Sequence, residues 1–144
     1  MEKLKKLILE ENVDITCLTK VNKDWRKVAY DNTIWGATSG WRENKRVQIA
    51  HNRSVAPGDS KYQVGGRAML MLGDVTFRIS AQGADSRNLG RWSYITLTGK
   101  NSVTTTVFTC YCPCRSTSIG SAFAQQLLYI VMDKQTLPKI DCPR

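Results

Sequence analysis

The residues best suited to chemistry lie in and around one stretch, GRWSYITLTGKNSVTTTVFTCYCPCR, at positions 90–115. Two runs rich in β-branched and aromatic residues, 92–97 and 103–111, flank the polar segment 98–102, so the stretch is predicted to form a β-hairpin. Its second strand should end at Pro113. Because α/β sheets usually place their ligands at strand ends, this polar tip is the predicted place of function.

Positive and aromatic side chains alternate near the ends of the predicted strands: Arg67, Arg91, Trp92, Lys100, Tyr111 and Arg115. Such cations contact phosphates and such rings stack on bases, which predicts a nucleic-acid-binding surface. The same cations are also compatible with solubilising charge spread over the surface. The chain has 21 Lys and Arg against 12 Asp and Glu, and this net charge of +9 favours a polyanion such as nucleic acid or an acidic membrane surface.

Cysteine and histidine do not predict a metal or catalytic site. Cys110, Cys112 and Cys114 alternate along a predicted strand, where their spacing is too long for three thiolates to meet one ion. These three are expected to be structural thiols. Because the chain has five cysteines, an odd number, and no export signal is recognised, all five are expected to be free rather than part of a disulfide framework. His51, the only histidine, has no carboxylate in a motif relation to it, so it is predicted to be a solvated loop residue.

The elements that must position these residues follow from local pattern. Helices are predicted at 2–11, at 25–34 behind an Asp24 cap, and at 118–132, and strands at 13–18, 45–50, 67–72 and 75–80, with Gly73 and Asp74 joining the last two as a tight hairpin. A single α/β (α+β) domain follows, with a mixed, mostly antiparallel β-sheet covered by helices on one face. The central strands are apolar on both faces, so something should cover the second face.

The chain is expected to be intracellular, in cytoplasm or nucleus, with no membrane partner. No apolar run approaches the roughly 20 residues needed to cross a bilayer, and the N-terminus MEKLKKLILEEN is too charged for a signal peptide.

Five segments, in order, resemble motifs of the endonuclease/exonuclease/phosphatase superfamily, especially its retroelement-like members. They are DITCLTKVN at 14–22 followed by Asp24 and Trp25, YQVGG at 62–66, GRWS at 90–93, YCP at 111–113, and AQQ at 124–126. The similarity spans residues 3–144 and covers the N-terminal half of the family domain. It implies half of a four-layer α/β sandwich of the deoxyribonuclease I-like fold, and a Mg²⁺-dependent phosphodiesterase or endonuclease ancestry.

Departures from the family pattern bear on catalysis. The family's metal-binding Glu falls on Lys20, and a protonated lysine opposes a divalent cation. Asp24 lies too far along the loop to preserve metal geometry in its place. The family's Asp- and His-bearing segments would lie beyond Arg144, so no metal ligand is assigned and Mg²⁺ is not expected to bind tightly. Tyr111 matches the family tyrosine that approaches substrate phosphate, although it would equally suit an ordinary strand end with a hydrated hydroxyl.

Two functions follow from this resemblance and charge. One is a nuclease-like chain, inactive alone, whose partner is a polypeptide that supplies the missing half. The other is a non-catalytic basic module that binds nucleic acid, DNA in preference to RNA, or binds a protein partner, including a second copy of itself, through an exposed sheet face. Lys20 joins the predicted basic contacts on the active-site edge that the resemblance implies.

Overall fold

The computed structural model describes residues 2–53, 63, 66–86 and 88–110. The chain divides into two compact units after Tyr111, and these residues belong to the first of them. Their elements are α1 (Glu2–Glu10), β1 (Ile15–Thr19), α2 (Ile34–Ala37), β2 (Lys45–Ala50), β3 (Arg67–Leu72), β4 (Ile79–Ala84), β5 (Trp92–Thr98) and β6 (Thr104–Cys110). Short 3₁₀ turns occupy Trp25–Lys27, Tyr30–Asn32, Gly73–Arg78 and Lys100–Ser102.

The first sheet has the antiparallel order β1-β3-β2. Its central strand β3 reads RAMLML, and all six residues are buried. This confirms the expectation of a strand apolar on both faces, because a strand with alternating polar residues would leave one face in water. The register pairs Arg67 with both Thr19 of β1 and Ala50 of β2, so these strand ends meet at one end of the sheet.

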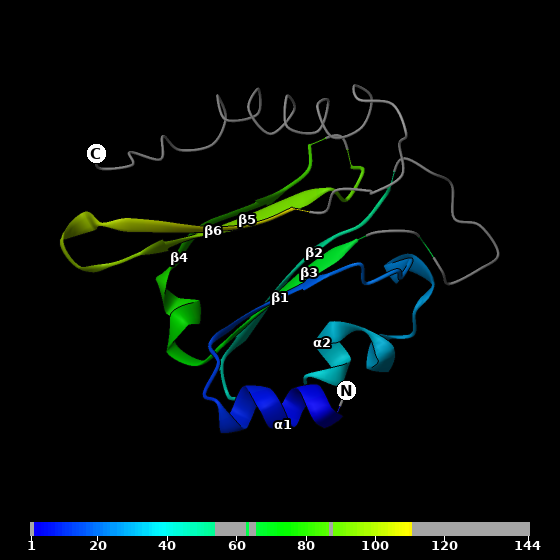
Figure 1. The fold of residues 1–144 in the computed structure, drawn as a ribbon, viewed down its shortest axis with the longest axis horizontal. Coiled ribbons are helices and arrows are strands. Elements are labelled where there is room, and N and C mark those ends of the chain that lie inside the picture. The colour runs from blue at the N-terminus through cyan, green and yellow to red at the C-terminus, as the bar shows by residue number, and fades with distance from the viewer. Residues whose placement is uncertain (1, 54–62, 64–65, 87, 111–144) are drawn as a thin grey trace, which may run out of the picture. The chain divides into compact units, whose positions relative to one another are not determined.

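One face of the first sheet is covered by α1 and the segment that contains α2 (Figure 1). Ile8 from α1 and Ile34 from α2 pack in one buried cluster with Leu70 and Leu72 of β3. In α1 the apolar residues recur at helical spacing, so that one stripe faces the sheet. The predicted helical cover on one face is therefore confirmed, although it is small.

The second face of the first sheet is covered by a second antiparallel sheet of order β4-β5-β6 (Figure 1). Met69 and Met71 of β3 form a second buried cluster with Ile95 and Leu97 of β5. The α/β class with mostly antiparallel strands is thus confirmed. The prediction of a single sheet with one exposed face is wrong. The described residues form three layers: helices, first sheet and second sheet.

The hairpin predicted around 98–102 is present. β5 and β6 pair from Trp92 with Cys110 to Thr98 with Thr104, and the 3₁₀ turn Lys100–Ser102 closes them. Asn101 and Ser102 have positive φ, which lets the connection reverse within a few residues.

The predicted helix over 25–34 is wrong. Asp24 does cap the first turn, since its side chain accepts a hydrogen bond from the Arg26 N–H, but Val28 and Ala29 are extended and end that turn. A new cap starts α2, where the Thr33 hydroxyl accepts from the Gly36 N–H. Local caps and the extended residues between them therefore divide the segment into two 3₁₀ turns and one short α-helix.

The predicted tight hairpin at Gly73 and Asp74 is also wrong. The segment Gly73–Arg78 is a 3₁₀ turn that carries the chain from the first sheet to the second, and β4 pairs with β5 rather than β3. Val75 is buried in the core between the sheets, which fixes this crossing. The strand predicted at 75–80 is observed as β4 at Ile79–Ala84, four residues further along. The helix predicted at 118–132 lies outside the described residues.

Candidate functional site

Segments from both sheets meet at the end where β3 begins. Residues 20–26 follow β1, and residues 51–53 follow β2. From the second sheet, Leu89 forms a bridge with Asn52, and the Arg53 N–H donates to the Asn88 carbonyl over 2.6 Å. The name basic end is used below for residues 20–26, 51–53, 66–67, 85–86, 88–91 and 109–110.

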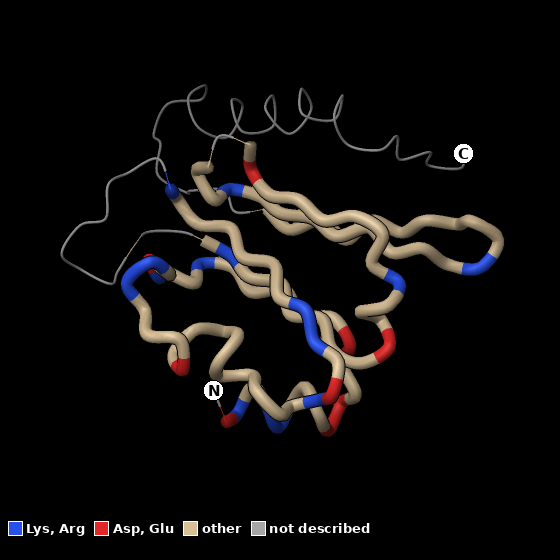
Figure 2. The backbone as a smooth tube through the Cα atoms, turned by 180° about the vertical axis from the view of Figure 1, so that it is seen from behind, with Lys and Arg blue, Asp and Glu red and all other residues tan. Residues whose placement is uncertain are grey.

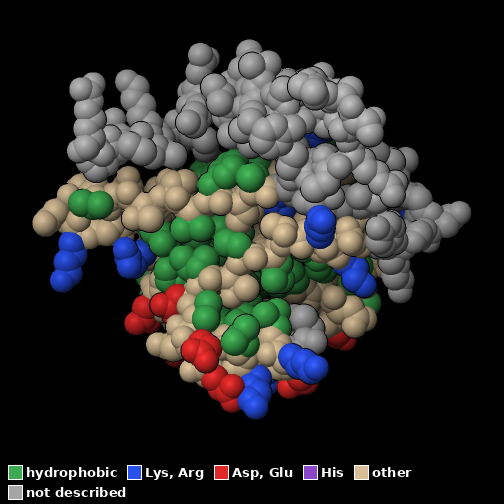
Figure 3. All heavy atoms as spheres, in the orientation of Figure 1, with side chains coloured by type: hydrophobic (Ala, Val, Ile, Leu, Met, Phe, Trp, Pro, Cys, Tyr) green, Lys and Arg blue, Asp and Glu red, His purple; other side chains and the backbone are tan. Residues whose placement is uncertain are grey.

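Cations outnumber carboxylates at the basic end (Figure 2). The cations are Lys20, Lys23, Arg26, Arg53, Arg67 and Arg91, and the carboxylates are Asp24 and Asp85. Other acidic residues of the first sheet's connections, Asp14, Glu43 and Asp74, lie beyond the opposite strand ends, and acidic side chains gather there near α1 (Figure 3). Cations also lie toward that opposite end, where the carboxylates offset them: Lys3, Lys5, Lys6, Arg42, Lys45 and Arg46. Among the described residues the excess of positive charge is therefore larger at the basic end, which attracts a polyanion there.

Asp24 is neutralised by its own neighbour. Arg26 Nε donates to Asp24 Oδ1 and Arg26 Nη2 donates to Asp24 Oδ2, each over 2.8 Å, while the Arg26 backbone N–H also reaches Oδ1. These bonds from Arg26 lower the pKa of the Asp24 carboxyl. The bidentate pair engages both oxygens of a carboxylate that is itself buried, so Asp24 has little capacity left for a cation.

The described residues at the basic end do not fit the Mg²⁺ site that the family resemblance implies. By that resemblance a Glu ligand would be expected at position 20, where this chain has Lys20, and Asp24 is bound by Arg26. Asp85 accepts a hydrogen bond from the Arg91 N–H over 3.3 Å. Across the part of the chain that is described, no three His, Cys, Asp or Glu side chains are grouped as metal ligands. Mg²⁺ needs several oxygen ligands in octahedral geometry, which this set does not supply.

Arg67 is fully buried rather than placed at an open strand end. Its Nη1 donates to the Thr109 carbonyl of β6, and its Nε and Nη2 have no hydrogen-bond partner among the described residues. Desolvation lowers the pKa of its guanidinium to about 10, so the side chain stays charged at neutral pH. The predicted role as a surface phosphate contact does not suit this position.

His51 is 6% exposed, so the prediction of a solvated loop histidine is wrong. Gly90 lies against it: a Cβ at Gly90 would come within 2.5 Å of the His51 backbone. Burial lowers the pKa of the His51 ring, the charge of Arg53 acts in the same direction, and Asp24 opposes them. Neither ring nitrogen has a hydrogen-bond partner within the described segments.

The remaining predicted contacts are dispersed. Trp92 is buried on the outer face of the second sheet, with its ring 6.3 Å from that of Tyr94 and 6.0 Å from that of Phe108. Lys100 lies beyond the far end of β5, a strand of 7 residues, so the length of that strand, about 20 Å, separates it from the end where Arg91 lies. The structure thus brings Lys20, Arg67 and Arg91 to one end and leaves Lys100 at the other.

The remaining predictions concern Tyr111, Arg115, the cysteines and membrane-spanning helices. Tyr111 and Arg115 lie outside the described residues. Cys17 and Cys110 are free thiols and both are exposed, so Cys110 is not buried as the predicted structural thiol would be. The other cysteines fall outside the described part. Along the described residues, no helix is both long and apolar enough to cross a membrane.

Arg53, buried His51 and the Asp24–Arg26 pair are parts of the basic end that sequence reasoning missed. The Asp-x-Arg spacing at 24–26 was the available signal for the pair. Nothing local marked the other two, because their surroundings come from the distant segment 88–91.

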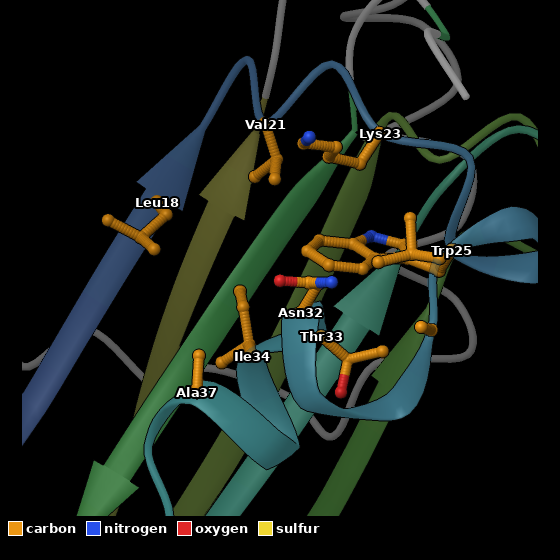
Figure 4. A pocket seen from close by; sticks show the side chains of 10 residues that line it. Leu18, Val21, Lys23, Trp25, Asn32, Thr33, Ile34 and Ala37 are labelled. Carbon is orange, nitrogen blue, oxygen red and sulfur yellow. The ribbon is translucent and has the colours of Figure 1, made fainter. Parts of the chain in front are cut away.

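Two pockets lie at or near the basic end. One, of ≈ 250 Å³, is lined by His51, Arg53, Asp85, Asn88 and Gly90 among others. The other, of ≈ 370 Å³, lies between the end of β1 and the segment 25–37, with Trp25 in its wall (Figure 4).

No protein-family model, curated protein or solved structure matches this chain.

Proposed function

We propose that the chain is a non-catalytic module that binds the phosphate backbone of nucleic acid through the basic end. The observation that carries this proposal is the strand register, which gathers Lys20, Arg53 and Arg91 around the start of β3 while Arg26 neutralises Asp24. Backbone phosphates are recognised mainly by such clustered cations, independently of sequence.

The proposal also includes the ancestry of the chain: its resemblance to the endonuclease/exonuclease/phosphatase superfamily is taken to reflect descent from a nuclease-like protein. What supports this ancestry is that two sheets pack together with helices on the outer face of the first sheet, which is part of the four-layer architecture of the family. In this view DNA is the preferred polyanion, the setting is intracellular, and a Mg²⁺-dependent phosphodiesterase is the ancestral activity. Hydrolysis by this chain alone is not proposed, because Lys20 stands where the family holds its metal-binding Glu.

Salt dependence tests the proposal. Binding of a short labelled DNA duplex, followed by fluorescence anisotropy between about 50 and 200 mM salt, should weaken steeply as salt rises. Arg53→Gln and Arg91→Gln should each reduce the slope of log K against log salt by about 1. Lys100→Gln is the matched control: it removes an exposed cation from the far end of β5 and should leave the slope unchanged.

Two results would count against the proposal. Affinity that stays flat across this salt range would exclude phosphate binding. A slope reduced as much by Lys100→Gln as by Arg53→Gln would exclude the basic end as the binding surface. With supercoiled plasmid and Mg²⁺, the same preparation should leave the plasmid intact, and EDTA-sensitive cleavage would contradict the non-catalytic role.

A further inference from the structure

We propose that the pocket beside Trp25 binds the base of a nucleotide, so that the chain holds one unstacked nucleobase in addition to backbone phosphates. This inference rests on the proposed function and names a second site for the same partner. The base pocket is defined by Leu18, Val21, Lys23, Trp25, Val28, Ala29, Asn32, Thr33, Ile34 and Ala37.

The size and walls of the base pocket suit a flat ring. Its volume is ≈ 370 Å³, within the range of small-molecule sites, and aliphatic side chains such as Leu18, Val21 and Ile34 form much of its lining. The Trp25 ring lies across the pocket from Leu18 and Ala37 (Figure 4). Single-stranded nucleic acid is commonly bound by stacking a base on an aromatic ring of this kind.

The indole N–H of Trp25 is a donor for which the described segments supply no acceptor. Nε1 is buried and has no hydrogen-bond partner among the described residues. A buried indole N–H normally finds a partner, and leaving it unpaired is costly. Ring nitrogens and carbonyl oxygens of a nucleobase are acceptors. Because Nε1 is buried, a bound base accepts its hydrogen bond only when the Trp25 ring turns toward the pocket.

Asn32 adds an adaptable polar group. Its side chain points toward the Trp25 ring (Figure 4) and its residue is exposed, so the amide can turn toward a ligand. An amide offers one donor and one acceptor side by side, which is the pattern that base edges present. The neighbouring Thr33 hydroxyl is already used, because it donates to the Tyr30 carbonyl and accepts from the Gly36 N–H.

Lys23 provides the charge that distinguishes a nucleotide from a neutral ring. It lines the base pocket and is exposed. It lies three residues after Lys20, on a loop held to the start of β3 by the hydrogen bond from the Val21 N–H to the Gly66 carbonyl. A phosphate attached to the bound base would therefore lie toward the basic end, where the following phosphates of the strand are proposed to bind.

Calorimetric titration with 5′-AMP and with ribose 5-phosphate tests this inference. 5′-AMP should bind about tenfold more tightly than ribose 5-phosphate, because only the former carries a base to stack. Ala37→Leu should fill the pocket and weaken 5′-AMP binding by about tenfold. Ala81→Leu is the matched control, since Ala81 is also partly buried but lies on β4, outside the base pocket.

Asn32→Ala serves as a second variant that does not depend on core packing, because Asn32 is exposed. Asn32→Ala should weaken the binding of 5′-AMP several-fold without changing the thermal unfolding midpoint. Equal affinity for 5′-AMP and ribose 5-phosphate, or 5′-AMP binding unaffected by both pocket variants, would overturn the inference. Tight binding of octanoate in place of 5′-AMP would overturn it too and would assign the pocket to an aliphatic acid.

The two proposals fail separately. A steep salt slope for duplex DNA, together with no 5′-AMP binding, overturns the base pocket alone. Pocket-dependent 5′-AMP binding with a flat DNA salt dependence supports the base pocket and overturns the basic end.

Discussion

At the scale of single residues, Arg67 shows how a cation at a strand end can serve the fold. Every other residue of β3 is apolar, and the guanidinium is buried with them. Burying a charge is costly unless it is paired or hydrogen-bonded. The bond to the Thr109 carbonyl joins β3 to β6 across the layers, and the charge of Asp85 acts favourably on the guanidinium. Arg67 therefore holds the two sheets together at the basic end.

His51 provides a prediction about pH. Burial and the charges of Arg53 and Arg26 lower its pKa, and Asp24 opposes them, so the ring should titrate below the usual value of about 6.5. Because the folded pKa is depressed, the unfolded chain binds the proton first. The free energy of unfolding should therefore fall as pH drops through about 6.5 toward the folded pKa, and should not depend on this group above about pH 7.5.

The measurement for His51 is direct, since the chain has one histidine and its ring protons give one set of NMR signals. A titration midpoint at or above about 6.5 would contradict the buried environment. Denaturant unfolding of His51→Gln should show a smaller acid-induced loss in the free energy of unfolding. The difference from the parent chain is the contribution of His51, and the loss that remains comes from the carboxylates.

The residues of the basic end were predictable only in part. Strand ranges read from the sequence place Lys20 and Arg67 at strand ends, and the register then brings these ends together. The burial of Arg67 and His51 could not be predicted, because it comes from β6 and from segment 88–91, which are distant in sequence. Nothing local distinguishes a cation that faces water from one enclosed by a second sheet.

At the scale of elements, Gly90 controls how the chain enters β5. Its φ is +67°, and a Cβ would meet the His51 Cα and C at 2.5 Å, both backbone atoms that cannot move aside. Gly90→Ala should therefore destabilise the fold by about 3 kcal/mol or more, from left-handed strain plus overpacking. Urea unfolding of the variant gives the value.

Gly40→Ala is the control for Gly90→Ala. Gly40 also has positive φ, +71°, but nothing lies within 4 Å of its added Cβ. Gly40→Ala should lower the free energy of unfolding only by the cost of the left-handed backbone strain, about 1–2 kcal/mol. Equal losses for both variants would show that segment 88–91 does not pack against His51 as described.

Elements differed in how far the sequence predicted them. β2 and β3 were predicted with their observed bounds, and the hairpin of β5 and β6 was predicted nearly so. β2 alternates polar and apolar residues, whereas β3, β5 and β6 have runs of apolar or β-branched residues. Segments 25–34 and 73–80 were predicted wrongly. In segment 25–34, the non-helical residues Val28 and Ala29 and the second cap at Thr33 interrupt the helix. In segment 73–80 the deciding contact is tertiary, because Val75 is buried in the core between the two sheets.

At the scale of the whole described unit, the second sheet answers the question of what covers β3. The sequence indicated that both faces of the central strands were apolar, and an outside partner was one predicted cover. Met69 and Met71 instead pack against Ile95 and Leu97 of the same chain. The face of the first sheet that packs on the second sheet is therefore not available for a protein partner. The basic end remains the surface on which the proposed function depends.

The shared core also predicts that the two sheets unfold together. Ile95 on β5 is fully buried against β3 residues, so Ile95→Ala should lower the free energy of unfolding by about 2–5 kcal/mol. Amide hydrogen exchange should then speed up in β1–β3 as well as in β4–β6, because both sheets lose the same packing.

Phe77→Ala is the control: Phe77 is 74% exposed, and its loss should change the free energy of unfolding by less than about 0.5 kcal/mol. Faster exchange confined to β4–β6 in Ile95→Ala would mean that the sheets are stabilised independently.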